Sequence, residues 1–255
     1  MKYIRFIISR LKKNKKEKTF YNKGDKINNN LKGVVYTCVT NNYDGLKEPL
    51  YKPDNLDFKI FTDYRLNNVD TCWQYCPLPL DNNKSIGNFA NRYCKMNPFI
   101  LFNNYDFAIY IDGNVQIFSD ISRLYSIAKE SKLGIAMHKH SCRNCIYEEA
   151  KICIREEKGN EKGIKDQIKK YKKEGFPDDF GLFEATIIVI DLKNKKAKEI
   201  LETWWSEFCN TNSKRDQLSF PYIIWKLGYN MSELGVLGNN EYLNPMFRIA
   251  RKHNM

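Results

Sequence analysis

Short apolar runs alternate with longer amphipathic stretches along this chain of 255 residues. Five runs of strand length are rich in Val, Ile, Phe and Tyr and cover residues 33–40, 58–62, 107–111, 133–137 and 185–191. Between and after them the spacing predicts helices from residue 85 or 88 to a break at Pro98, and over about 120–129, 147–174, 195–209 and 216–227. Strands that alternate with helices predict a single α/β domain with a mostly parallel central sheet and helices on both faces.

The run 107–111 is apolar at every position, which is typical of a strand in the middle of a parallel sheet, buried on both faces. In open α/β sheets, ligands bind beyond the carboxyl ends of the strands. Polar residues directly after the predicted strands are therefore candidates for a ligand site. These candidates are Thr40, Asn41, Tyr43, Asp63, Asp112 and Gly113.

The segment Asp112-Gly113-Asn114 predicts a metal site. A carboxylate and an amide oxygen two residues apart can both turn toward one hard cation, Mn²⁺ or Mg²⁺. Such a cation would neutralise charge that develops on a diphosphate leaving group. An ordinary Asp-Gly turn after a strand is the other interpretation of these residues.

Arg92 and Lys95 are three residues apart in the predicted helix before the 107–111 strand, so they project from one helix face. We expect them to hold a diphosphate, Arg92 through its forked guanidinium and Lys95 as a point charge. A solvated helix face is the alternative interpretation of this pair.

The net charge of +12 is concentrated at the N-terminus, because eight of the first twenty residues are Lys or Arg and one is Glu. This uneven distribution argues against a nucleic-acid binder, which would carry a basic stripe on its folded body. We predict a basic amphipathic leader at 1–20, a polar linker at 21–32 and the folded domain at 33–255. The leader suits an anionic membrane surface, and a solvated tail is the alternative; its apolar part is too short to span a bilayer.

Eight cysteines do not predict a disulfide framework here, because the chain is long enough to build a large core. Cys38 and Cys94 lie within apolar patterns and are expected to be small buried residues. Two His and two Cys within 138–145 are potential zinc ligands, yet four ligands so close together would need a very tight loop. A loop beside the active site is the favoured interpretation, and we expect a reducing compartment.

Several segments, in the same order over residues 33–253, resemble a family of glycosyltransferase-like domains known from plant mucilage and turgor-regulation proteins and from bacterial polysaccharide clusters. The matching pieces are 61–63, 91–98, 105–114, 145–150, 181–184, 204–205 and 215–220. The resemblance implies a GT-A fold, a nucleotide-sugar donor and a metal held at Asp112 and Asn114. Asn114 departs from the wider GT-A pattern, in which a second Asp stands at this position.

Other site residues are placed by the predicted strand and helix ends and by the resemblance. Glu184 precedes a buried strand and Asp216 begins a helix, so either could be the general base for an acceptor hydroxyl, and Asp216 could instead cap its helix. The acceptor-binding candidates are His138, Glu184 and Arg215, and Arg215 could instead position a phosphate or pair with an acid. His253 is a candidate third metal ligand, because many GT-A enzymes take one from a C-terminal histidine; a tail histidine with no ligand is the alternative.

The sequence thus predicts an enzyme that moves a sugar from a nucleoside-diphosphate sugar, with UDP favoured, to a glycan or lipid-linked acceptor. We expect it in the cytoplasm, at the inner face of the membrane, in surface polysaccharide assembly. A catalytically silent glycan-binding module and a metal-dependent hydrolase of a lipid or a nucleotide-sugar are the alternatives.

Overall fold

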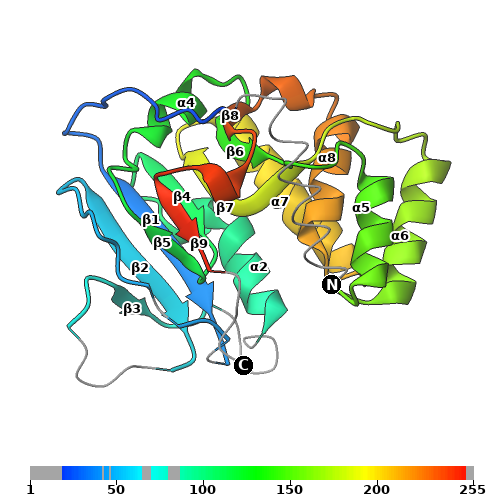
Figure 1. The fold of residues 1–255 in the computed structure, drawn as a ribbon, viewed down its shortest axis with the longest axis horizontal. Coiled ribbons are helices and arrows are strands. Elements are labelled where there is room, and N and C mark those ends of the chain that lie inside the picture. Colours follow the sequence, from blue (N-terminus) through cyan, green and yellow to red (C-terminus); the bar gives the residue numbers. More distant parts are fainter. Residues whose placement is uncertain (1–18, 42, 46, 65–69, 80–86, 251–255) are drawn as a thin grey trace.

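The computed structural model describes residues 19–41, 43–45, 47–64, 70–79 and 87–250. They form one α/β domain around a seven-stranded sheet with the order β3-β2-β1-β4-β7-β6-β8 (Figure 1). The strands are β1 Gly33–Val39, β2 Leu56–Thr62, β3 Gln74–Cys76, β4 Phe107–Ile111, β6 Ile135–Lys139, β7 Phe183–Asp191 and β8 Gly235–Gly238. Every strand except β7 runs in the same direction, so the expected mostly parallel sheet is confirmed.

The two central strands β1 and β4 are buried at every residue and pair in parallel, with Gly33 opposite Phe107 and Tyr36 opposite Tyr110. Their unbroken apolar sequences satisfy the requirement of a strand covered on both faces. Strand β7 lies beside β4 and is antiparallel to both of its neighbours. Its apolar sequence predicts a buried strand but carries no information about direction.

Helices cover both faces of the sheet, as predicted. One face carries α2 Asn88–Met96, α3 Pro98–Leu101, α5 Ile146–Arg155, α6 Glu161–Lys173, α7 Lys195–Asn210 and α8 Asp216–Lys226. The other face carries α4 Leu124–Glu130 and a small sheet of β5 Val115–Ile117 and β9 Phe247–Ile249. Two short 3₁₀ helices, η1 Met231–Glu233 and η2 Glu241–Leu243, flank β8. Alternate residues of β1 point into the two core layers, Val34 into one and Val35 into the other.

Two helix boundaries differ from the prediction. The charged stretch 147–174 is two helices, α5 and α6, because Gly159 adopts a left-handed conformation (φ 91°) in the turn between them. Helix α4 begins at Leu124, and the carboxylate of Asp120 accepts the backbone N–H of Ser122 in the preceding turn instead of capping the helix. The predicted break at Pro98 is confirmed, since this proline occupies the first turn of α3.

The segment 21–32, expected as a linker, packs against the domain. Tyr21 forms a β-bridge with Gly238, and the backbone N–H of Asn22 donates to Leu237 O at 2.8 Å. Ile27 and Leu31 contact the core layer on the α4 face. Most of the basic leader at 1–20 lies outside the described residues, and so does His253.

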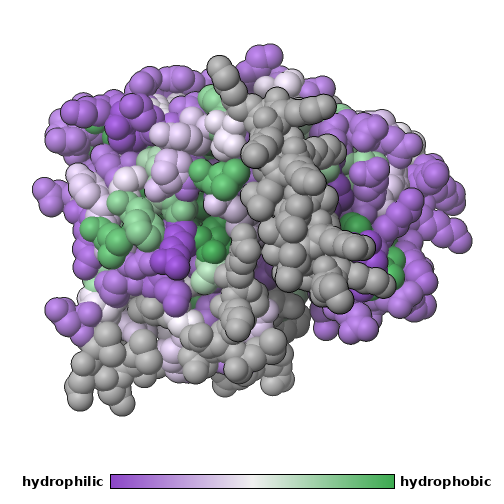
Figure 2. All heavy atoms as spheres, in the orientation of Figure 1, coloured by the Kyte–Doolittle hydropathy of each residue, from purple (hydrophilic) through white to green (hydrophobic). Residues whose placement is uncertain are grey.

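Among the residues that the structure describes, no disulfide is present, and Cys38 and Cys94 are buried as expected. None of the described helices has the length and apolar composition that a bilayer span needs. The face shown in Figure 2 is mainly hydrophilic, with its apolar side chains in small groups. The fold therefore places its apolar residues in two core layers and leaves a polar surface in which a ligand site can form.

Candidate functional site

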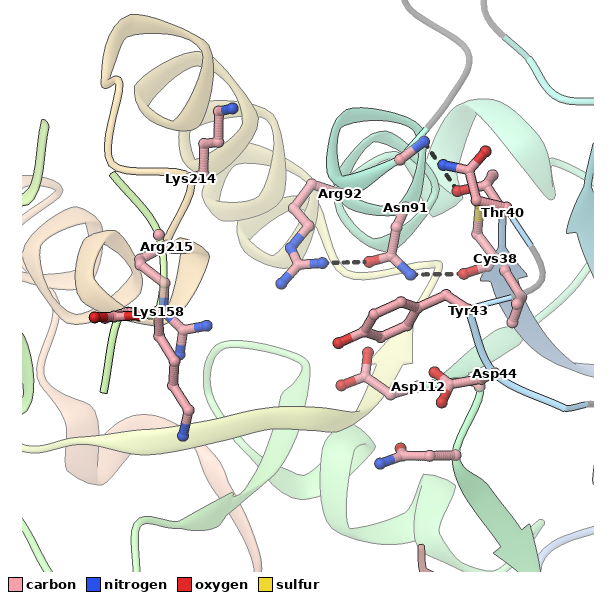
Figure 3. A pocket seen from close by; sticks show the side chains of 17 residues that line it. Cys38, Thr40, Tyr43, Asp44, Asn91, Arg92, Asp112, Lys158, Lys214 and Arg215 are labelled. Atoms are coloured by element: carbon pink, nitrogen blue, oxygen red, sulfur yellow. Dashed lines mark hydrogen bonds between the residues drawn. The ribbon is translucent and has the colours of Figure 1, made fainter. Parts of the chain in front are cut away.

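A cavity of about 470 Å³ opens at the carboxyl ends of β1 and β4. The connections from these neighbouring strands leave the sheet in opposite directions, which creates a crevice at the switch point of an α/β sheet. Its volume lies in the range of small-molecule sites. The cavity brings together six of the predicted ligand residues, in the sequence order Thr40, Asn41, Tyr43, Arg92, Asp112 and Gly113, and adds Asp44 and Asn114 (Figure 3).

Gly113 allows the two loops to meet. A Cβ atom at this position would lie 2.4 Å from Cγ2 of Val39 and 3.1 Å from Cβ of Asp44, so any side chain would force the loops apart. The close approach places Asp44, from the turn after β1, beside the Asp112–Asn114 segment after β4. The turn 41–44 was among the polar segments expected at the strand ends, but Asp44 was not among the predicted donor or metal residues.

Asp112 is held by one of its two carboxylate oxygens. The Tyr110 hydroxyl donates to Oδ1 at 2.7 Å, and Lys95 Nζ lies 3.5 Å from the same oxygen. Burial and the adjacent Asp112 charge raise the pKa of Tyr110 well above its usual value, so this hydroxyl remains a donor. The Asp112 side chain is 34% exposed and points into the cavity (Figure 3). Its second oxygen is available to a ligand.

The Asn114 amide is fixed in an orientation that leaves its oxygen without a donor. Nδ2 donates to Ala250 O at 2.9 Å, and the backbone carbonyl of Asn114 accepts the N–H of Ala250 at 2.9 Å. Oδ1 is buried and has no hydrogen-bond partner among the described residues. A buried amide oxygen without a donor is costly, and a cation in the cavity would remove that cost.

Oxygen atoms of Asp44, Asp112 and Asn114 together suit a hard divalent cation, Mg²⁺ or Mn²⁺. Within the described ranges no three His, Cys, Asp or Glu side chains group as a metal site, so this set depends on the Asn114 amide. The carboxylates supply negative charge, and the cavity leaves room for water or phosphate oxygens as further ligands.

Arg92 and Lys95 do project from one face of α2, but both are paired with Asp216. Arg92 Nη2 lies 3.2 Å from Asp216 Oδ1, and Lys95 Nζ lies 2.9 Å from Oδ2. Lys95 is 2% exposed, so it supports Asp112 and Asp216 from inside the domain rather than reaching a ligand. The expectation that both cations hold a diphosphate stays a prediction, and the pairing of Lys95 with the buried Asp216 and the partly exposed Asp112 counts against it for Lys95.

The same ion pairs determine the chemistry of Asp216. Burial by itself would raise the pKa of Asp216, but the charges of Arg92 and Lys95 outweigh burial and hold this pKa far below its usual range. A carboxylate with so low a pKa accepts a proton poorly, which argues against Asp216 as the general base. Asp216 is also not the cap: Arg215 occupies the N-cap position of α8, with no side-chain cap bond.

A second cavity, of about 290 Å³, adjoins the first beyond Asp112. Arg92, Asp112, Lys158 and Arg215 line both cavities. Glu184 lines the second one from the start of β7. Because β7 is antiparallel to β4 and β6, its first residues lie beside the carboxyl ends of those strands. The reversed strand therefore brings Glu184 to the site edge of the sheet.

Glu184 has a polar neighbour at each carboxylate oxygen. Gln217 Nε2 donates to Oε2 at 2.9 Å, and Nε2 of His140 lies 3.5 Å from Oε1. The backbone N–H groups of Cys142 and Arg143 donate to Nδ1 of His140 at 3.2 and 3.0 Å, and Nη2 of Arg143 lies 3.1 Å from Nε2 of the same ring. The 138–145 loop thus stands beside the site, as the favoured interpretation of this segment expects.

Two predicted site residues lie elsewhere. His138 is completely buried, with Nε2 2.8 Å from Asn244 Nδ2, and burial lowers its pKa to about 4. The proposal that it contacts the acceptor is wrong, because its side chain points into the core. Asp63 accepts the backbone N–H of Asn41 at 3.0 Å and borders a separate hollow, so it supports the loop after β1 from outside the main cavity.

Together, the fold and the site define an α/β protein with a small-molecule cavity at the switch point of its sheet. Residues 78–248 match the TOD1/MUCI70 glycosyltransferase-like domain family, and the chain belongs to this family. No curated protein matches the chain.

Solved structures with a similar arrangement are glycosyltransferases. The bifunctional glycosyltransferase WbbM is 16% identical over 86% of this chain and 40% of its own, with a TM-score of 0.47. Mouse xyloside xylosyltransferase 1 is 10% identical over 81% of this chain and 84% of its own, with a TM-score of 0.44. The mannosyltransferase Ktr4p from S. cerevisiae is 11% identical over 78% of this chain and 66% of its own, with a TM-score of 0.41. The chain spans less than half the length of WbbM.

Proposed function

We propose that this protein transfers a sugar from a nucleoside-diphosphate sugar to a hydroxyl group of a glycan or lipid-linked acceptor, with a divalent cation bound by Asp44, Asp112 and Asn114. The observation that carries the proposal is the buried Asn114 oxygen without a donor, beside Asp112, in the cavity at the ends of β1 and β4. Membership of a glycosyltransferase-like family supports the same reaction class.

The cavity offers a separate surface to each part of such a donor. Thr40, Asn41 and the half-exposed ring of Tyr43 form the wall after β1, where a base can stack on the aromatic ring. Asp112 and Asn114 lie between this wall and the second cavity. We therefore assign the nucleoside, with uridine favoured, to the wall after β1. The diphosphate lies at Asp112, and the transferred sugar lies toward Glu184.

In this proposal Glu184 is the proton acceptor. The acceptor oxygen forms a bond to the anomeric carbon, and its proton passes to the Glu184 carboxylate. The bond between the anomeric carbon and the diphosphate oxygen breaks, and its electron pair leaves with the nucleoside diphosphate. The divalent cation, when bound, neutralises charge on that leaving group. Gln217 and His140 orient the carboxylate through the contacts described above.

A nucleotide-binding screen tests the donor site. UDP, GDP, CMP and their common sugar conjugates are added with and without Mn²⁺, and binding is followed by calorimetry and by thermal stabilisation. We expect one nucleotide class to bind in a metal-dependent way, and we expect Asp112→Ala to abolish this dependence because it removes the exposed carboxylate ligand. Asp54→Ala, an exposed aspartate outside the cavity, is the matched control. Failure of every nucleotide under every metal condition would refute the proposal.

The acceptor is proposed to be presented at the cytoplasmic face of a membrane, where the basic residues of the leader at 1–20 attract anionic headgroups. We expect the full chain to co-sediment with vesicles of phosphatidylcholine and phosphatidylglycerol, and less so at high salt. Removal of residues 1–18 is expected to abolish co-sedimentation while nucleotide binding persists. Equal co-sedimentation of both forms would show that the leader has no such role.

A further inference from the structure

Two turns form the wall of the first cavity that faces Asp112. One is the turn 157–159 between α5 and α6, and the other is the segment 211–215 between α7 and α8. They contribute Lys158, Lys214 and Arg215 to the cavity lining, on the side opposite Asp44 and Asp112 (Figure 3). Sequence analysis selected only Arg215 among these three cations.

Backbone contacts hold the two turns together. The N–H of Asn160 donates to Ser213 O at 3.0 Å. A Cβ atom on Gly159 would lie 2.5 Å from Ser213 O, and one on Gly163 would lie 2.3 Å from Asn212 O, so both glycines permit contacts that any side chain would prevent. The two helix pairs therefore present their turns to the cavity as one rigid surface.

Backbone strain is concentrated around this cavity. The described non-glycine residues with a left-handed φ are Asn41, Glu157, Asp179 and Lys214, and all of these except Asp179 line it. Such conformations are strained for residues with a side chain and persist where surrounding packing enforces them, often at ligand sites. Lys214 (φ 58°) is one of these residues, and it lines the cavity together with the following residue, Arg215.

Two of the three cations on this wall have no carboxylate close by. In the described part of the chain, neither Lys214 nor Arg215 has an Asp or Glu oxygen within 4.0 Å, whereas Lys158 pairs with Glu156 at 2.7 Å. Arg215 Nε is buried and makes no hydrogen bond to a described residue, although the Arg215 charge contributes to the lowered pKa of Asp216. Arg92, by contrast, is already paired with Asp216. The cations that remain for a ligand therefore come from the α7–α8 turn rather than from α2.

We infer that Lys214 and Arg215, with Lys158 beside them, bind the diphosphate of the donor from the side opposite Asp112 and Asn114. This inference rests on the proposed function and assigns the leaving group to a second set of residues. The Arg215 guanidinium offers a fork to phosphate oxygens, and the two lysines act as point charges. When the anomeric carbon–oxygen bond breaks, its electron pair remains on the diphosphate, and the positive wall stabilises that charge.

Inorganic pyrophosphate and UDP, each with Mn²⁺, are the probes for a calorimetric test, and uridine is the probe without phosphate. Charge-assisted hydrogen bonds predict that Arg215→Gln and Lys214→Gln each weaken pyrophosphate and UDP binding about 10-fold or more, with any uridine binding unchanged. Arg215→Lys keeps the charge without the fork and is expected to bind with intermediate strength. Lys198→Gln, an exposed lysine on α7, is the control.

The Lys214 side chain is exposed, so its replacement is not expected to destabilise the fold. The Lys214→Gln variant therefore tests the cationic wall even if the Arg215 variants are less stable than the wild type. Wild-type affinity for pyrophosphate in both glutamine variants, together with loss of binding in Asp112→Ala, would overturn this inference and leave the proposed function intact. A wild-type protein that binds neither UDP nor pyrophosphate with any divalent metal would overturn both.

Discussion

Replacement of Asp216 with Asn is expected to lower the free energy of unfolding by about 3–5 kcal/mol, because it leaves two cations without their buried counter-charge. Asp216 is 3% exposed and holds Arg92 and Lys95 at 3.2 and 2.9 Å. Lys95 cannot move to water from its buried position at 2% exposure. Chemical denaturation of both proteins at pH 7 measures the difference.

A matched control is Asp166→Asn, which breaks an exposed i,i+4 pair with Lys162. Exposed pairs of this kind are worth about 0–1 kcal/mol, so only a small change is expected. The double variant Asp216→Asn, Lys95→Met is expected to recover part of the loss, since it removes one uncompensated charge together with its partner. If Asp216→Asn lowers the free energy of unfolding no more than the control does, the buried ion pairs of Asp216 do not stabilise the fold more than an exposed pair.

The lowered pKa of the Asp216 carboxyl group makes the stability of the protein depend on pH. The pKa of Asp216 is depressed in the folded protein and is about 3.9 in an unfolded chain. Its contribution is therefore complete above about pH 5 and is lost as the pH falls below about 4 toward the folded-state value. The difference in unfolding free energy between wild type and Asp216→Asn should be constant from pH 5 to pH 8. It should shrink below pH 4.

Replacement of Glu184 with Gln is expected to lower kcat about 100- to 10,000-fold, the usual contribution of a general base. The new amide has nearly the same shape as the carboxylate, and its oxygen can still accept the hydrogen bond that Gln217 Nε2 donates to Glu184 at 2.9 Å. Glu184 lies in the second cavity, away from the nucleoside wall, so binding of the nucleoside diphosphate should be unchanged. Steady-state turnover and calorimetry on one preparation separate the two effects.

Glu148→Gln is the control for that measurement, because Glu148 is an exposed glutamate on α5 outside both cavities. It is expected to have wild-type turnover. A Glu184→Gln enzyme with full activity would assign the proton to another group. Loss of nucleotide binding in this variant would instead place Glu184 in the donor site.

Local sequence was sufficient for the elements and for the position of the central site. The run 107–111 is apolar throughout and is a buried central strand, because a strand covered on both faces has no place for a polar residue. The polar residues directly after it lie in the main cavity for the same reason: the strand ends where burial ends. The break at Pro98 also follows from one residue and its restricted backbone.

Partners distant in sequence could not be predicted. Lys95 and Asp216 are 121 residues apart, and helical spacing shows the face on which Lys95 lies but not which carboxylate packs against it. The sequence therefore predicted that Lys95 binds a phosphate and that Asp216 could be the general base. His138 was misassigned for a related reason, since the end of β6 alone does not reveal that η2 and β9 cover it.

The sequence by itself determined the five longest strands, most of the helices and the Asp112-Gly113-Asn114 edge of the site, because hydrophobic period and backbone restriction are properties of neighbouring residues. Tertiary structure alone decided the direction of β7, which brings Glu184 to the same edge. It also decided the approach of Asp44 to Gly113 and the joining of the two cationic turns. These features depend on contacts between residues that are far apart in the sequence, and local sequence patterns do not determine such contacts.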